Sequence, residues 1–283
     1  MCTRQSLLVA MGLLISGTLH AAQQSNDKLE TLGRGDVLIF SAPPRETAEE
    51  GVAIYQPVAA YFSKVTGKRV IYRHPRTYGI YRTEMVNGVY DIAFDGAHFN
   101  GYRVQKLNHN ILARVPGDRN FVVITQKGEK INTIADLAGK AVCVQPPPNL
   151  SALLLLSQFD NPARQPFIVP RKGHDAIYQG VVSGHCTAGI MPKPNLKTVD
   201  TGVIKILFES PMIADQAFSA GPRVTREDQV KLSAALLSTE SASVTEKLRA
   251  KFKIGDNLVA GTNKEYAPFA DLLRHEWGFR DEK

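Results

Sequence analysis

Six polar side chains stand at the ends of predicted strands, where the turns of an open α/β sheet gather around a ligand. They are Arg45, Asp95, His98, Asn149, Ser151 and His174. Guanidinium and backbone N–H groups bind the oxygens of an anion, and a carboxylate accepts a hydrogen bond from a hydroxyl group. Together these residue types predict a binding site for a small oxyanion that carries a proton.

The stretch 141–158, AVCVQPPPNLSALLLLSQ, indicates how part of such a site is built. Its three consecutive prolines, at 146–148, exclude a helix interior and a sheet ladder, so they predict a rigid turn between a strand and a helix. Asn149 is a favourable N-cap, and the free N–H groups of a first helical turn attract anions. Asn149 could equally serve only as the cap of its own helix, and the sequence leaves both interpretations open.

Each candidate also has an ordinary structural role. Arg45 could be a solvated loop charge, and Asp95 could cap the helix that follows it. His98 and His174 have no partner visible in the sequence. Tyr81 is a further candidate ligand residue, although a tyrosine in such a helix more often packs than binds.

Alternating β-branched and helical runs predict the fold. From residue 36 the pattern is strand, helix, strand, helix, strand, and it restarts with AVCV at 141. We expect an α/β protein of two lobes, each a doubly wound, mostly parallel sheet with flanking helices, and a ligand cleft between the lobes. The first lobe should comprise residues 35–120 and 217–283, with C-terminal helices, and the second residues 121–216. The crossing segments are expected near 115–126 and 211–221, and the polar stretch 126–133 suggests a boundary nearby.

The N-terminus has the pattern of a secretory signal. Arg4 precedes the apolar run Leu7–Leu19, and the small residues Ala21 and Ala22 follow. The apolar run is shorter than the roughly 20 residues that a membrane-spanning helix needs. We therefore expect residues 1–22 to be removed near Ala22 and the mature chain to be a soluble protein of the periplasm.

Charge and motifs exclude several classes of function. The formal net charge of +7 is spread along the chain, which disfavours nucleic-acid binding and fits mild attraction to anions. The sequence lacks the GxSxG pattern of a hydrolase and shows no clustered metal ligands. We therefore expect no enzyme, no metal and no cofactor, and a monomeric chain.

Two cysteines, Cys143 and Cys186, remain after cleavage, each within or at the edge of a predicted strand. In an oxidising compartment an even number of cysteines suggests a disulfide. The strands AVCV and TAGIM are expected to be parallel neighbours in the second lobe, which favours pairing. Two buried free thiols are the alternative.

Three segments carry a resemblance to a known family: YDIAFDGAHF (90–99), TIADLAGKAVCVQPPPNLSALLL (133–155) and GHDAIYQGVVSGHCTAGIMP (173–192). Through them the chain resembles the phosphate, phosphite and phosphonate substrate-binding proteins of ABC transporters, which are type 2 periplasmic binding proteins. The resemblance covers nearly the whole mature chain. It implies a small anionic solute and a membrane permease as partners. The alternative is a ligand-sensing subunit that docks on a membrane histidine kinase.

The resemblance carries over unevenly to single residues. The family has a run of hydroxyl residues at the start of a second-lobe helix, of which only Ser151 matches here. His174 matches the family's pocket histidine, and Asp215 lies near its acidic pocket residue. Asp95 stands where many relatives have an aromatic residue, and a buried carboxylate there would repel a fully ionised phosphonate. The resemblance thus implies capture of an oxyanion without naming the oxyanion.

Overall fold

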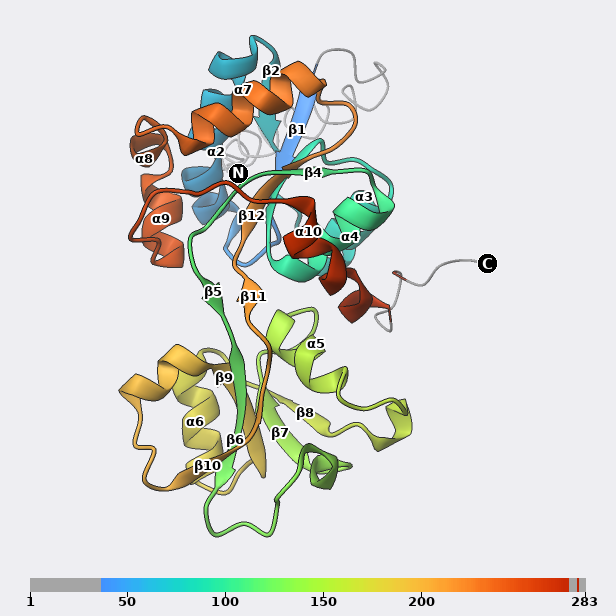
Figure 1. Ribbon diagram of the computed structural model, residues 1–283, viewed down its shortest axis with the longest axis vertical. Helices are drawn as coiled ribbons and strands as arrows, with labels where there is room; N and C mark the ends of the chain where they lie inside the picture. The colour runs from blue at the N-terminus through green and yellow to red at the C-terminus, as the bar shows by residue number, and fades with distance from the viewer. Residues whose placement is uncertain (1–36, 275–278, 280–283) are drawn as a thin grey trace, which may run out of the picture.

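The computed structural model describes residues 37–274 and Phe279. The expected signal sequence, residues 1–22, lies outside them. Two five-stranded sheets, each flanked by helices, form two lobes, and a two-stranded ladder runs between them (Figure 1). The two-lobe α/β class expected from the sequence is confirmed. Within the described residues, no helix has the length and the apolar character needed to cross a membrane.

The sheet of the first lobe has the strand order β2–β1–β3–β12–β4. Its strands are β1 (Val37–Ser41), β2 (Arg69–Tyr72), β3 (Ile92–Asp95), β4 (Asn110–Arg114) and β12 (Ala217–Ala220). Strand β1 is parallel to β2 and β3, but β12 is antiparallel to both β3 and β4. The sheet is therefore mixed, not mostly parallel, because β12 arrives from the other lobe and no helical crossover sets its direction.

Helices flank this sheet. They are α2 (Ala48–Thr66), α3 (Tyr78–Val86), α4 (Ala97–Lys106), α7 (Arg226–Leu237), α8 (Ser241–Val244), α9 (Glu246–Phe252), α10 (Asn263–Tyr266) and the 3-10 helix η4 (Ala267–Leu273). Helix α2 begins at a capping box in which Thr47 and Glu50 satisfy each other's backbone N–H groups. It ends at Gly67, whose left-handed φ of 69° costs a glycine little.

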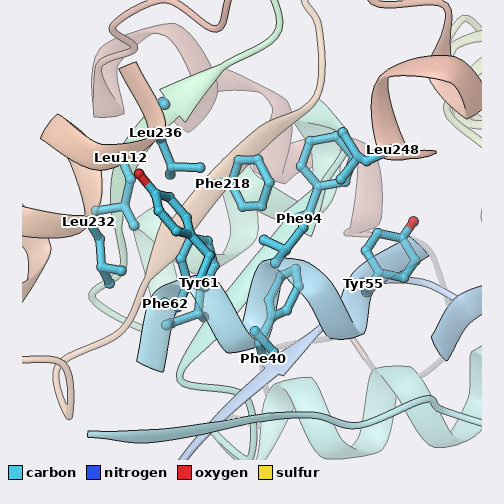
Figure 2. Close-up of a cluster of buried hydrophobic side chains, with 14 of the residues drawn as sticks. Phe40, Tyr55, Tyr61, Phe62, Phe94, Leu112, Phe218, Leu232, Leu236 and Leu248 are labelled. Atoms are coloured by element: carbon cyan, nitrogen blue, oxygen red, sulfur yellow. The ribbon is translucent and has the colours of Figure 1, made fainter. Parts of the chain in front are cut away.

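Aromatic rings fill the space between α2 and the sheet (Figure 2). The ring centroids of Phe40 and Phe62 lie 5.5 Å apart in an edge-to-face arrangement, and those of Phe94 and Phe218 lie 4.6 Å apart. Each such pair contributes about 0.5–1.5 kcal/mol beyond the area that it buries. This core fixes β1 and β3, from whose ends the loops toward the second lobe begin.

The sheet of the second lobe has the order β10–β6–β9–β7–β8. Its strands are β6 (Phe121–Gln126), β7 (Ala141–Val144), β8 (Phe167–Pro170), β9 (Ala188–Pro192) and β10 (Ile204–Glu209). The helices of this lobe are α5 (Leu150–Leu156) and α6 (His174–Val182), together with the 3-10 helices η1 (Ile134–Leu137), η2 (Pro162–Arg164) and η3 (Lys193–Thr198). Strand β7 is parallel to β8 and β9, whereas β6 is antiparallel to β9 and β10. The polar stretch 126–133 follows β6 inside this lobe, so it does not mark the boundary that its composition suggested.

A disulfide ties two segments of the second lobe. It joins Cys143 in β7 to Cys186, which lies just before β9, and the two Cα atoms are 5.7 Å apart. The expected parallel pairing of β7 with β9 is confirmed. The bond therefore links neighbouring strands through the buried face on which α6 packs.

Two short strands connect the lobes. They are β5 (Asp118–Arg119) and β11 (Ile213–Ala214), and they pair antiparallel, with Ile213 opposite Arg119. The chain leaves the first sheet after β4 and returns to it as β12, so the second lobe is an insertion in the first (Figure 1). The crossing strands bring charged residues to the level at which the two lobes meet.

Candidate functional site

A cavity of about 200 Å³ lies where the two lobes face each other. Its polar lining comes from the β1–α2 loop, the starts of α3, α4 and α6, the crossing segments and the turn that precedes α5: Arg45, Tyr78, His98, Arg119, Gln145, Asn149, His174, Asp215 and Gln216. The structure thus brings together five of the residues singled out in the sequence, which are Arg45, His98, Asn149, His174 and Asp215. It leaves Tyr81, Asp95 and Ser151 outside the lining.

Arg45 is the cation that the first lobe contributes. One guanidinium nitrogen, Nη1, donates to Oε1 of Gln216, and Nη2 lies 3.7 Å from Oδ1 of Asp95. The guanidinium also lies 5.2 Å from the centroid of the Phe252 ring, a distance at which cation–π attraction operates. These contacts hold the head group at the cavity, and a quarter of the side chain stays exposed.

Arg119 is a second cation of the cavity, and sequence reasoning missed it. Its Nη2 donates to Oδ2 of Asp215, while the backbone N–H of Gln216 donates to Oδ1 of the same carboxylate at 2.8 Å. Arg119 lies in a two-residue strand whose position no periodic pattern reveals. Its placement depends on the pairing of β5 with β11, which brings residues almost a hundred positions apart together.

His98 is buried at the start of α4 and is 5% exposed. Neither ring nitrogen has a partner in full hydrogen-bonding geometry. Burial lowers the pKa of His98 to about 3; the positive charge of Arg45 acts in the same direction, and the backbone of Pro148 opposes both. The imidazole is therefore neutral at physiological pH, with one ring nitrogen that donates and one that accepts.

His174 is the first residue of α6 and follows Gly173, whose φ of 84° turns the chain into the helix. Its Nδ1 has no hydrogen-bond partner. Burial lowers the pKa of His174, and the neighbouring carboxylate of Asp175 acts in the opposite direction. The second lobe thus also presents a ring nitrogen without a partner to the cavity.

Asn149 caps α5, as the sequence suggested in one of its two interpretations. Its Oδ1 accepts from the backbone N–H of Ser151 at 3.0 Å and from the Ser151 hydroxyl at 2.8 Å. Ser151 is 2% exposed and does not line the cavity. The hydroxyl that the family resemblance singled out is therefore committed to the cap, whereas Asn149 itself reaches the cavity wall.

Tyr81 and Asp95 lie beneath the cavity and are fully buried. The hydroxyl of Tyr81 and Nη1 of Arg103 both donate to Oδ2 of Asp95, and Nη2 of Arg103 donates to the Tyr81 hydroxyl at 2.8 Å. Burial raises the pKa of Asp95, and the charges of Arg103 and Arg45 act the other way. This cluster supports Arg45 from below, and its buried carboxylate does not reach the cavity.

The charges of the lining sum to one positive charge. Arg45 and Arg119 each contribute one, Asp215 removes one, and the ion pair of Asp95 with Arg103 beneath them cancels. No group of three or more histidine, cysteine, aspartate or glutamate side chains that could hold a metal occurs in the part of the chain that the structure describes. The cavity is therefore suited to an anion and rich in hydrogen-bond donors.

Two α/β lobes that are joined by two crossing strands and enclose a small polar cavity define a periplasmic-binding-protein fold. The chain belongs to the family described as the periplasmic phosphonate substrate-binding proteins of ABC transporters, whose model matches residues 40–276. This is a family of transport proteins and not of enzymes. The resemblance seen in the sequence is confirmed.

Individual relatives agree with this assignment. The phosphate-import protein PhnD of Mycolicibacterium smegmatis is 26% identical over 245 residues, which cover 73% of this chain and 75% of that protein. PhnD1 from Prochlorococcus marinus, solved in complex with methylphosphonate, superposes with a TM-score of 0.59 at 17% identity, over 84% of this chain and 97% of that one. XAC2383 from Xanthomonas citri, solved bound to ATP, superposes with a TM-score of 0.64 at 9% identity, over 85% of this chain and 98% of that one. At such identities the solved structures show a shared fold.

Proposed function

We propose that this protein captures a small oxyanion of the phosphate or phosphonate type in the cavity between its lobes and delivers it to the permease of an ABC transporter. The observation that carries the proposal is the pair of arginines, Arg45 and Arg119, which line one small cavity together with two histidines. Both ring nitrogens of His98 and the Nδ1 of His174 are buried without a hydrogen-bond partner. Family membership, the curated relative's name and an N-terminus of secretory pattern support capture in the periplasm.

Binding would use donors that the protein already holds in place. Each arginine donates one hydrogen bond to a side chain just after β11, Arg45 to Gln216 and Arg119 to Asp215. Further N–H groups of each guanidinium can donate to the oxygens of a ligand. The neutral ring of His98, which lines the same cavity, adds one N–H group. Because these groups are already oriented, little side-chain freedom is lost on binding.

Titration calorimetry of the mature protein with phosphate, phosphite, methylphosphonate and sulfate tests the proposal. At a hundred times its Kd a bound ligand should also stabilise the protein by about 2.7 kcal/mol in thermal unfolding. Failure of phosphate, phosphite and methylphosphonate to bind would refute the proposed function, whether or not sulfate binds.

Substitution then tests the site. Arg45→Ala should weaken the best ligand about 10- to 100-fold, since a hydrogen bond to a charged group contributes about 1.5–3 kcal/mol. Arg164→Ala removes the same charge from an exposed position in the second lobe and should leave Kd unchanged. Equal affinity of the two variants would place the ligand elsewhere.

A sensory subunit for a membrane histidine kinase would use the same cavity. Uptake of radiolabelled ligand by cells with and without this protein separates the two roles. Transport requires that uptake be lost without the protein, whereas a sensor leaves the initial rate of uptake unchanged.

A further inference from the structure

We propose that the cavity selects oxyanions that carry no ammonium group, and that Arg119 sets this selectivity by occupying the carboxylate of Asp215. The inference rests on the proposed function and adds the chemical class of the ligand to it. Its basis is an imbalance in the lining, which offers unused donors but, among the described residues, no unused carboxylate.

Asp215 is the single carboxylate among the described residues that line the cavity. Both of its oxygens are engaged, Oδ2 by Arg119 and Oδ1 by the backbone N–H of Gln216. An ammonium group that leaves water needs a charged partner to offset the loss of hydration. Here that partner is already neutralised by a guanidinium.

The side-chain amide oxygens of the lining also already accept hydrogen bonds within the protein. Each accepts a hydrogen bond from a neighbouring side chain: Oε1 of Gln145 from Asn149, Oδ1 of Asn149 from Ser151, and Oε1 of Gln216 from Arg45. An ammonium group brings three donors and no acceptor, so at these amide oxygens its hydrogens would compete with existing bonds. The side-chain acceptors left to it, such as the Tyr78 hydroxyl and the unprotonated ring nitrogen of His98, carry no charge. Oxygens of an anion meet the opposite situation, because Arg45 and Arg119 bring charged N–H donors to the same lining.

Charge works in the same direction. The lining carries one net positive charge from Arg45, Arg119 and Asp215, and His98 is neutral. A positive group held within a few ångströms of either guanidinium is repelled, and in a partly desolvated cavity that repulsion is stronger than in water. An anion without an ammonium group is attracted by the same field.

The selectivity concerns atoms close to the oxyanion. An adjoining cavity of about 760 Å³ shares His174, and its lining includes two further carboxylates, those of Asp175 and Asp200, together with Lys253 of the first lobe. A long substituent could carry a cation into that second cavity. A substituent of one or two atoms stays close to the oxyanion, so short ligands test the inference most directly.

Ethylphosphonate and aminomethylphosphonate are a matched pair for the experiment, because they have the same number of non-hydrogen atoms and differ by a methyl or an ammonium group. Titration calorimetry of the wild-type protein should give a Kd for ethylphosphonate at least tenfold lower than that for aminomethylphosphonate. Thermal unfolding of every variant checks that it is folded.

Arg119→Gln releases one oxygen of Asp215 and removes a positive charge, so the ratio of the two Kd values should fall below threefold or reverse. Arg119→Lys keeps the charge and a donor for Asp215, and it should keep the wild-type preference. The exposed control Arg164→Gln should leave the ratio unchanged. If the role of Arg119 were purely structural, Arg119→Gln would raise the Kd values for both ligands by the same factor.

Three results would overturn the inference. Aminomethylphosphonate could bind the wild type as tightly as ethylphosphonate, which leaves the proposed function intact. The ratio could stay unchanged in Arg119→Gln, which removes Arg119 from the explanation. If neither these phosphonates nor phosphate, phosphite or methylphosphonate bind, the proposed function fails and the inference fails with it. Should Arg119→Gln not fold, the wild-type ratio alone decides.

Discussion

Gly101 lies on the face of α4 that packs against the C-terminal helices, and it leaves no room for a side chain. A Cβ atom built there would lie 2.5 Å from the carbonyl oxygen of Tyr266 and 2.6 Å from the backbone nitrogen of Ala270. Both are backbone atoms, so no rotamer change can relieve the contact. We therefore expect Gly101→Ala to destabilise the protein by forcing α4 away from η4.

The magnitude follows from two opposing effects. Overpacking by one methyl group typically costs about 1–3 kcal/mol, and the rigid backbone neighbours here favour the upper end. Alanine in a helix regains up to about 1 kcal/mol relative to glycine. The net loss is about 2 kcal/mol, which for a chain of this size lowers Tm by roughly 4–8 °C.

Gly79→Ala is the matched control, since it makes the same change near the start of α3. The nearest atom to its added Cβ is the Thr77 hydroxyl oxygen at 3.7 Å, an ordinary contact. This variant should unfold at the wild-type temperature or slightly above it. Thermal and urea unfolding of both variants measures the difference, and a Gly101→Ala protein as stable as Gly79→Ala would refute the close-approach argument.

Three further outcomes are expected. Thiol titration of the unreduced protein should find neither Cys143 nor Cys186 free, and two free thiols would contradict the disulfide. Replacing both cysteines by serine should lower the free energy of unfolding in urea by at most roughly 4 kcal/mol, because the bond closes a loop with a 43-residue separation. Asn149→Ala should lower the free energy of unfolding by about 1 kcal/mol through loss of the cap. Ser151→Ala should leave the Kd for phosphate unchanged, and a large loss of affinity would show that Ser151 contacts the ligand. Burial lowers the pKa of His109 to about 3, below its unfolded value near 6.5, so the stability associated with its neutral ring is complete above pH 6.5 and is lost as pH falls toward 3. In urea unfolding, His109→Gln should therefore lose less stability than the wild type between pH 7 and pH 4, by up to roughly 3 kcal/mol, and equal losses would contradict the assignment.

Local patterns predicted much of the fold. The strand–proline turn–helix at 141–156 forms as expected because proline geometry and the Asn149 cap are encoded within a few residues. The neighbouring positions of β7 and β9 follow from the repeated strand–helix pattern. The direction of β12 could not be predicted in this way, because it depends on where the chain re-enters the first lobe.

The site was harder to predict, because it depends on contacts distant in sequence. Asp95 stands at a strand end, a position typical of ligand contacts, but Arg103 eight residues later folds under it and engages its carboxylate. Nothing in the helical pattern distinguishes Arg103 from an exposed basic residue near a helix end. Arg119 became recognisable only once β11 lay beside β5.

The position of β12 has a consequence for the order in which the chain assembles. This strand lies between β3 and β4, yet it follows the whole second lobe in the sequence. As the chain emerges, the second lobe has all its strands by Glu209, whereas β3 and β4 still lack the partner that joins them. The second lobe can therefore form as a local unit, while the first must close over a long loop, a slower step that exposes unpaired strand edges. A chain truncated before Ala217 would therefore retain every strand of the second lobe but lack β12, the strand that joins β3 to β4 in the first.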